Sequence, residues 1–260
     1  VDITPIQYDK MGLYYSHKPD KDGFFNRYKH KVNVNLLKNA AYLLPWSSWV
    51  RDSLVQDYHV PPERIKVVAP GVDLDKWRPQ SEFSEGPLKI LFVGGDFYRK
   101  GGDILRDAFR LLPSGSAELH MVTRTPLEPE ASMYVYNDLY PNSPELIKLY
   151  QTANVFVLPT KAEAFGIAAV EASAAGLPVV ATAVGGVPDI VVTNKTGFLI
   201  EPGDVAGLAS CLQRLAETPE LRRQLGQAAR QRAEQFFDAR RNAACILELL
   251  QTAVAQNNHL

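Results

Sequence analysis

Cysteine is scarce in this chain of 260 residues. The two that occur, Cys211 and Cys245, both lie in helical patterns, and neither has partners at a spacing typical of a metal site. We therefore expect no disulfide and no metal site. Unpaired thiols are typical of a reducing compartment, so the sequence predicts a cytoplasmic location.

Long apolar runs and an excess of one charge are also missing. No apolar run approaches the length of a membrane span, and no signal-peptide pattern opens the chain. Lys and Arg total 28 against 29 Asp and Glu, which argues against nucleic acid as a partner and favours small molecules. Arginines in the last helical patterns most often mark a solvated face, and peripheral contact with a membrane surface is the alternative.

The chain divides by composition into three parts. It begins with Val1 rather than methionine, on a stretch (VDITPI) whose composition predicts extended structure, so we expect a piece of a longer protein. Residues 1–80 mix polar and aromatic positions and include two short predicted strands, 42–44 and 65–69, with a helix between them that begins at Ser47 or Ser48. The other expected parts are a regular domain at 81–236 and a final helix at 237–260 that packs back toward the amino-terminal part.

Strands and helices alternate in the regular domain. The predicted strands are 88–94, 117–123, 133–136, 155–158 and 178–182, and the predicted helices are 101–112, 143–152, 167–175, 204–217, 218–235 and 236–256. Such alternation predicts an α/β fold with a Rossmann-like, doubly wound parallel sheet covered by helices on both faces. Ligands of such sheets bind beyond the carboxyl ends of the strands.

The strongest functional signal follows one of these strands. Two glutamates, Glu163 and Glu171, stand eight residues apart around Gly166. On one helix they would lie about 12 Å apart along its axis, but the break at Gly166 lets both reach one ligand. The amides of the helix that begins at Ile167 suit a phosphate. Taken alone, the spacing favours a simpler interpretation, because the helix dipole attracts acidic residues in any case.

A second loop, GGDFYRKGG, follows the first predicted strand. Gly94 and Gly95 precede two cations, Arg99 and Lys100, which could neutralise a diphosphate. The loop is neither a dinucleotide fingerprint, since G-x-G-x-x-G is missing, nor a Walker loop, since no G-K-[ST] follows. Surface Lys and Arg are common, so this loop by itself is weak evidence.

Together these segments resemble the carboxyl-terminal, donor-binding half of a retaining glycosyltransferase of family 4 with the GT-B fold. The resemblance runs from about Tyr42 to Phe237 and includes VVAPGVDLDKWRP, FVGGDFYRKGG, the long stretch from ELIKLYQTANVFVLPT to AVGGVPDIV, and NKTGFLIEPGD. The pair of glutamates is its most specific element. The resemblance implies a nucleotide sugar as donor, such as a UDP-, GDP- or ADP-sugar, with no cofactor and no metal.

The resemblance also implies roles for individual residues. Glu171 resembles the glutamate that binds the ribose, Glu163 the one that faces the donor sugar, and Lys100 the lysine that binds the diphosphate. The segment Phe165, Gly166 and Ile167 resembles backbone that touches sugar and phosphate. Many relatives have an arginine where this chain has Gly95, and Arg99 is expected to supply that charge from another point. Glu163, Lys100 and Arg99 are thus the candidate catalytic residues, and Gly94, Gly95, Lys100, Glu163, Phe165, Gly166, Ile167 and Glu171 the candidate donor site.

The resemblance makes residues 1–80 the remnant of an acceptor-side domain, most of which is missing. We therefore expect the chain to bind nucleotide but to transfer sugar poorly, to an acceptor, saccharide or lipid, that the sequence does not identify. A non-catalytic nucleotide-binding or scaffolding module remains the alternative. A nicotinamide-dependent oxidoreductase is disfavoured, because its glycine fingerprint is missing.

Overall fold

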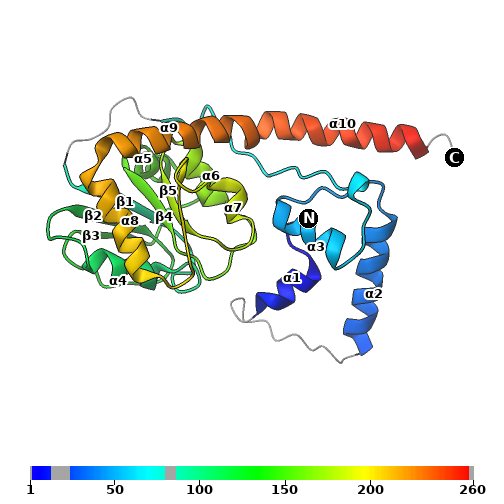
Figure 1. Ribbon diagram of the computed structural model, residues 1–260, viewed down its shortest axis with the longest axis horizontal. Coiled ribbons are helices and arrows are strands. Elements are labelled where there is room, and N and C mark those ends of the chain that lie inside the picture. The colour runs from blue at the N-terminus through cyan, green and yellow to red at the C-terminus, as the bar shows by residue number, and fades with distance from the viewer. Residues whose placement is uncertain (1, 13–23, 80–85, 258–260) are drawn as a thin grey trace. The chain divides into compact units, whose positions relative to one another are not determined.

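The computed structural model describes residues 2–12, 24–79 and 86–257 (Figure 1). Contacts divide the chain into two compact units. The first comprises residues up to Gly71 together with those from Ala239 onward, and the second comprises Val72–Asp238. We call the second the sheet unit.

The sheet unit is built on six parallel strands. They are β1 (Leu88–Val93), β2 (Ala117–Val122), β3 (Met133–Tyr136), β4 (Val155–Leu158), β5 (Val179–Thr182) and β6 (Gly197–Ile200), in the order β3-β2-β1-β4-β5-β6. Strand β1 pairs with β2 on one side and with β4 on the other, so the strand order reverses beside β1. The expectation of a doubly wound parallel sheet is confirmed.

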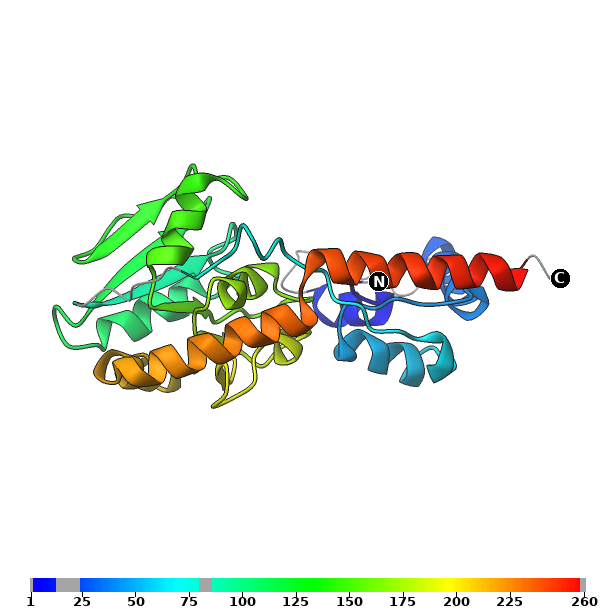
Figure 2. The same cartoon turned by 90° about the horizontal axis from the view of Figure 1, so that it is seen from above.

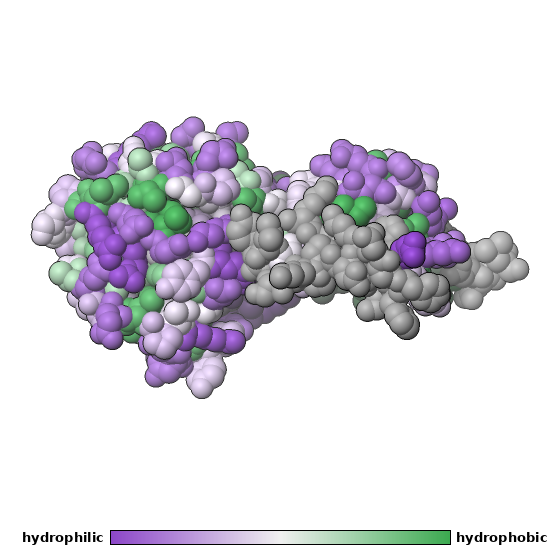
Figure 3. Space-filling view, turned by 90° about the horizontal axis from the view of Figure 1, so that it is seen from below, coloured by the Kyte–Doolittle hydropathy of each residue, from purple (hydrophilic) through white to green (hydrophobic). Residues whose placement is uncertain are grey.

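Helices cover both faces of this sheet (Figures 1 and 2). They are α4 (Gly102–Arg110), α5 (Pro144–Thr152), α6 (Ile167–Ala174), α7 (Val187–Ile190), α8 (Val205–Glu217) and α9 (Pro219–Phe236). Side chains alternate along each strand: Val155 and Val157 join α4 and α8 in the main core, whereas Phe156 stacks on Tyr150 of α5, 5.6 Å between ring centroids. On the face in Figure 3, hydrophilic side chains cover most of this unit, with apolar patches between them.

Two elements of the sheet unit were not predicted from the sequence. Strand β6 begins at Gly197, a residue that weakens strand patterns, and Val179 and Phe198 on β5 and β6 nonetheless lie inside the buried sheet. Helix α7 is a single turn in a stretch for which no helix was predicted.

The first unit differs from the expectation at its start. Residues predicted to be extended form α1 (Pro5–Lys10). Thr4 and Gln7 cap it reciprocally: the Gln7 amide donates to Thr4 Oγ1 at 3.3 Å, and the Thr4 amide donates to Gln7 Oε1 at 3.1 Å. The sequence signal was therefore a T-x-x-Q capping box with proline at the first helical position.

The remaining helices of this unit are α2 (Phe24–Asn39), α3 (Ser48–Gln56), the 3₁₀ turn η2 (Pro62–Arg64) and α10 (Ala239–Asn257). Ser47 caps α3, as one of the two predicted alternatives. The strands predicted at 42–44 and 65–69 are not formed; one parallel bridge joins Leu43 to Ile65, because these short segments pair with no further strand among the described residues. A separate core gathers Leu43, Val50, Leu54, Tyr58, Val60 and Ile65.

The division between the units lies earlier than residue 80. The Val72 amide donates to Phe237 O at 2.9 Å, and Val72 bridges Asp238. Trp77 is buried edge-on against Tyr150, 5.0 Å between centroids. Residues 72–79 therefore belong to the sheet unit, because their apolar side chains complete its core. Residues on the other side of this division contact each other within the first unit: Asn242 of α10 donates to Ala69 O at 2.9 Å.

Candidate functional site

Three loops meet at the carboxyl edge of the sheet. The loop from Gly94 to Gly101 follows β1, the loop from Pro159 to Gly166 follows β4, and the loop 183–186 follows β5. Because β1, β4 and β5 are consecutive in the sheet, the loops after them share one edge. This edge, at the reversal of strand order, is where ligands of such sheets bind.

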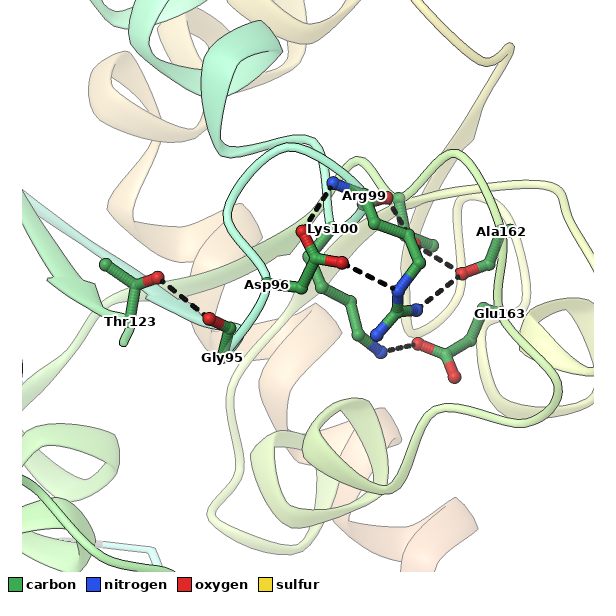
Figure 4. Close-up of polar contacts among 8 residues, drawn as sticks. Gly95, Asp96, Arg99, Lys100, Thr123, Ala162 and Glu163 are labelled. Atoms are coloured by element: carbon green, nitrogen blue, oxygen red, sulfur yellow. Dashed lines mark hydrogen bonds and ion pairs between the residues drawn. The ribbon is translucent and has the colours of Figure 1, made fainter. Parts of the chain in front are cut away.

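The first two loops are held together by backbone contacts. The carbonyl of Arg99 accepts from the Lys161 amide at 2.9 Å and from Thr160 Oγ1 at 3.2 Å. The Arg99 guanidinium donates to Ala162 O at 3.2 Å and to Asp96 Oδ2 at 3.2 Å (Figure 4). Arg99 thus fixes one loop against the other, and its charge faces the Asp96 carboxylate.

Lys100 and Glu163 form an ion pair across the two loops (Figure 4). Their side chains are only 19% and 10% exposed. Partial burial strengthens such a pair and makes either charge costly to leave alone. The structure therefore brings together two of the residues predicted from separate motifs.

Two glycines allow this close approach. A Cβ on Gly101 would lie 1.9 Å from Pro159 O, and one on Gly185 would lie 1.7 Å from Glu163 O. Their φ angles are 77° and 55°, in the left-handed region that favours glycine. Gly185 thus lets the third loop pass directly over the backbone of Glu163.

Glu171 has other neighbours. Tyr150 of α5 donates its hydroxyl to Glu171 Oε2 at 3.1 Å. Burial raises the pKa of Glu171 to about 7, against the opposing effects of this hydrogen bond and of the positive charge on Lys76. The pKa of Tyr150 is raised well above its usual value, mainly by burial, so the phenol stays protonated and donates.

The segment Phe165–Ile167 lies as expected at the start of α6. Gly166 precedes α6 with φ 111°, and Ile167 is partly exposed in its first turn. The Phe165 ring, in contrast, is buried 6.1 Å from that of Phe237, so only its backbone is left for a ligand. In the loop after β1, the Cβ of Lys100 lies 2.8 Å from the position that a Cβ on Gly94 would occupy.

The sequence reasoning missed one hollow at this edge. A cavity of about 140 Å³ lies at the ends of β1, β2 and β3 and is lined by Val93, Gly95, Val122, Thr123, Arg124, Tyr136, Asn137, Leu139, Pro141 and Leu146. Polar residues directly after β2 and β3, such as Arg124 and Asn137, were its available signal. Lys76 near Glu171 had no such signal, because it comes from a segment distant in sequence.

The described residues contain no cluster of three or more His, Cys, Asp or Glu side chains able to hold a metal ion. Within the same ranges, none of the helices combines the length and the apolar character that crossing a bilayer requires.

Curated proteins with related sequences are glycosyltransferases and a synthase. The D-inositol 3-phosphate glycosyltransferase of Streptomyces scabiei is 32% identical over 232 residues, which are 78% of this chain and 52% of that protein. Glycogen synthase of Mycobacterium tuberculosis is 29% identical over 244 residues, 83% of this chain and 55% of that protein. The chain thus spans about half the length of these relatives.

Solved structures share the fold. Sucrose-phosphate synthase from Thermosynechococcus elongatus superposes with a TM-score of 0.77 at 23% identity, covering 95% of this chain and 66% of that one. Anabaena Alr3699/HepE in complex with UDP gives a TM-score of 0.76 at 22% identity, covering 90% and 70%. The Rossmann-like sheet therefore matches structures of GT-B glycosyltransferases.

The sequence model of one family covers most of the sheet unit. It matches residues 73–232, from the turn after Gly71 to near the end of α9, and so includes all three loops of the site. The chain accordingly belongs to the family described as glycosyl transferases group 1.

Proposed function

We propose that this chain carries the donor half of a retaining, metal-independent glycosyltransferase of family 4 that uses a nucleotide sugar. The observation that carries the proposal is the Lys100–Glu163 pair, enclosed by three loops at the edge of the sheet beside the start of α6. Membership of the glycosyl transferases group 1 family supports it. The activity of the whole protein is part of the proposal, since the chain spans about half of its curated relatives.

The donor is placed by charge and hydrogen-bonding capacity. The diphosphate lies between Lys100 and the first amides of α6, where the helix dipole is positive. The ribose hydroxyls donate to Glu171, and Glu163 faces the sugar. Because Anabaena Alr3699/HepE was crystallised with UDP and with UDP-glucose, UDP is the first nucleotide to test.

The chemistry requires two charges to be stabilised. Cleavage of the anomeric bond leaves positive character on the sugar ring and negative charge on the departing diphosphate. Lys100 and the α6 amides stabilise the diphosphate, which removes the need for a metal ion, and the Glu163 carboxylate stabilises or orients the sugar ring. Arg99 contributes by holding the two loops together.

Calorimetric titration of the chain with UDP, GDP and ADP tests donor binding. We expect one nucleotide to bind, and Lys100→Ala and Glu171→Ala each to weaken it about tenfold or more. Arg223→Ala, at an exposed ion pair on α9, is the control and should leave affinity unchanged. No binding of any nucleotide would favour the scaffolding module instead.

Transfer is expected to be poor in this chain alone, because the acceptor, a saccharide or a lipid, would be bound largely by a domain outside it. Efficient turnover by the purified 260-residue chain would contradict this expectation. We further propose that the protein is cytoplasmic and that it contacts a membrane surface peripherally if its acceptor is a lipid. Free Cys211 and Cys245 support a reducing compartment.

A further inference from the structure

Arg124 follows β2 and lies over Gly95. Its Cγ, Cδ and Nε come within 3.7–3.9 Å of the position that a Gly95 Cβ would occupy. Arg124 is exposed and lines the cavity at the ends of β1, β2 and β3. The arginine therefore reaches the β1 loop from the neighbouring strand, on the side away from β4.

The backbone that carries Arg124 is fixed. The Arg124 amide donates to Gly95 O at 3.3 Å. Asn137 Nδ2 donates to Thr123 O at 2.9 Å and to Thr125 O at 3.1 Å, so the carbonyls on both sides of Arg124 are tied to the end of β3. Because the backbone is already ordered, binding of a ligand by Arg124 costs only the rotamer entropy of its side chain.

Three cations of the loops after β1 and β4 already have carboxylate partners. Arg99 pairs with Asp96, Lys100 with Glu163, and Lys161 with Asp103. Each pair is neutral, so together they add no net charge for an anionic ligand. Over residues 2–12, 24–79 and 86–257, the Arg124 guanidinium has no hydrogen-bond or ion-pair partner. Arg124 thus adds, beside the β1 loop, a positive charge that no described carboxylate pairs with.

We propose that Arg124 is a further donor-binding residue, whose guanidinium binds a phosphate of the nucleoside diphosphate. The inference rests on the proposed function. A guanidinium presents paired N–H donors that match phosphate oxygens. Unlike Lys100 and Arg99, it has no carboxylate among the described residues with which a phosphate would compete.

The first test compares ligands that differ in phosphate count. Wild type, Arg124→Ala and the surface control Arg223→Ala are titrated with UDP, UMP and uridine, or with the corresponding series of whichever base the wild type binds. We expect Arg124→Ala to weaken diphosphate binding about tenfold, to leave nucleoside binding unchanged, and to make diphosphate affinity less dependent on salt. Unchanged diphosphate affinity would overturn the inference, as would an equal loss with the nucleoside, which would indicate contact with the base.

The second test moves the charge. Removing the Arg124 side chain vacates the space over Gly95, so Gly95→Arg in the Arg124→Ala background restores a guanidinium to the same place. We expect the double variant to recover at least a few-fold of the lost diphosphate affinity. A double variant that unfolds at the same denaturant concentration as Arg124→Ala but binds no better would contradict the placement. Lys100→Ala distinguishes failure of this inference from failure of the proposed function. If neither wild type nor any variant binds a nucleotide, the proposed function fails. If Lys100→Ala loses diphosphate affinity and Arg124→Ala does not, only the role of Arg124 is rejected.

Discussion

At the scale of single residues, the Lys100–Glu163 ion pair bears on how the proposed donor would bind. We expect a diphosphate at Lys100 to compete with the Glu163 carboxylate for the ammonium group, which has three N–H donors. Weakening of the pair would make the carboxylate available to the donor sugar. Phosphate binding would then be coupled to the availability of Glu163.

Glu163→Gln should bind the bare nucleoside diphosphate more tightly than wild type, while sugar transfer by the complete protein falls. The amide no longer competes for Lys100, and we expect an increase of about three- to tenfold in affinity. Calorimetry with UDP measures it. Asp103→Asn is the matched control, because it frees Lys161 from the adjacent pair; equal affinities of wild type and Glu163→Gln would refute the competition.

Glu171 should make stability depend on pH. Its folded pKa, about 7, lies above the ordinary 4.5, so the folded state holds a proton that the unfolded state has lost between these values. Unfolding free energy therefore falls as pH rises through this window, by about 3 kcal/mol at most. Urea unfolding at pH 5 and pH 8 should show this loss in wild type and much less of it in Glu171→Gln. An equal loss of unfolding free energy in both proteins would show that a group other than Glu171 causes the pH dependence.

Candidate site residues could be picked from the sequence only where they lie in local motifs. Glu163, Glu171 and Lys100 stood out because a glycine-marked turn surrounds each pattern. The ion pair of Arg99 with Asp96, three residues earlier in the same loop, was not predicted, although its spacing was visible in the sequence. Lys76 could not be found in this way, because its placement near Glu171 depends on chain segments that meet only in the fold. Arg124 had a signal, its position directly after a predicted strand, but its placement over Gly95 depends on the pairing of β1 with β2.

At the scale of elements, the loops are positioned by contacts that tolerate little change. Gly185→Ala would place a methyl carbon at 1.7 Å from Glu163 O, at a φ of 55° that non-glycine residues rarely adopt. We expect a loss of about 1–3 kcal/mol in unfolding free energy and weaker nucleotide binding, because Glu163 moves. Urea unfolding and calorimetry measure the two effects.

Gly203→Ala provides the comparison for that variant. Gly203 also has a positive φ, 82°, but nothing lies within 4 Å of its Cβ position. The Gly203→Ala variant should therefore lose stability through backbone strain but keep the nucleotide affinity of the wild type. If both variants bind nucleotide like wild type, the close approach at Gly185 does not position Glu163.

The elements themselves were largely predictable because their signals are local. Apolar runs predicted β1 to β5, and helix formers with end signals predicted α4 to α6 and α8 to α10 within a few residues. Strand β6 is short and begins with glycine, so its own composition gave little signal. It forms because it pairs with the buried strand β5. At α1, the composition of the stretch VDITPI led to the prediction of extended structure. The reciprocal cap between Thr4 and Gln7 makes it a helix instead.

At the scale of the whole molecule, the two units have separate cores. We expect a fragment of residues 72–238 to fold alone and to bind nucleotide with the affinity of the full chain. Cooperative urea unfolding and calorimetry check both statements. An unfolded fragment would mean that the first unit contributes to the stability of the sheet unit.

A shorter fragment that begins at Gly86 gives the matched comparison. It lacks Trp77, which packs on Tyr150, and the carbonyls of Leu74 and Trp77 that accept from Arg230. It should be less stable than the longer fragment by several kcal/mol, in line with removal of a buried aromatic side chain. Equal stability would place the true boundary after residue 79.

The bridge between Val72 and Asp238 has a consequence for engineering. The polypeptide enters and leaves the sheet unit at two adjacent positions, as a guest domain does when it is inserted into a host. Both junctions of a chimaera can therefore be cut at one place on the surface of the fold. Exchanging the sheet unit for that of a relative would replace the proposed donor site and leave the residues of the first unit unchanged.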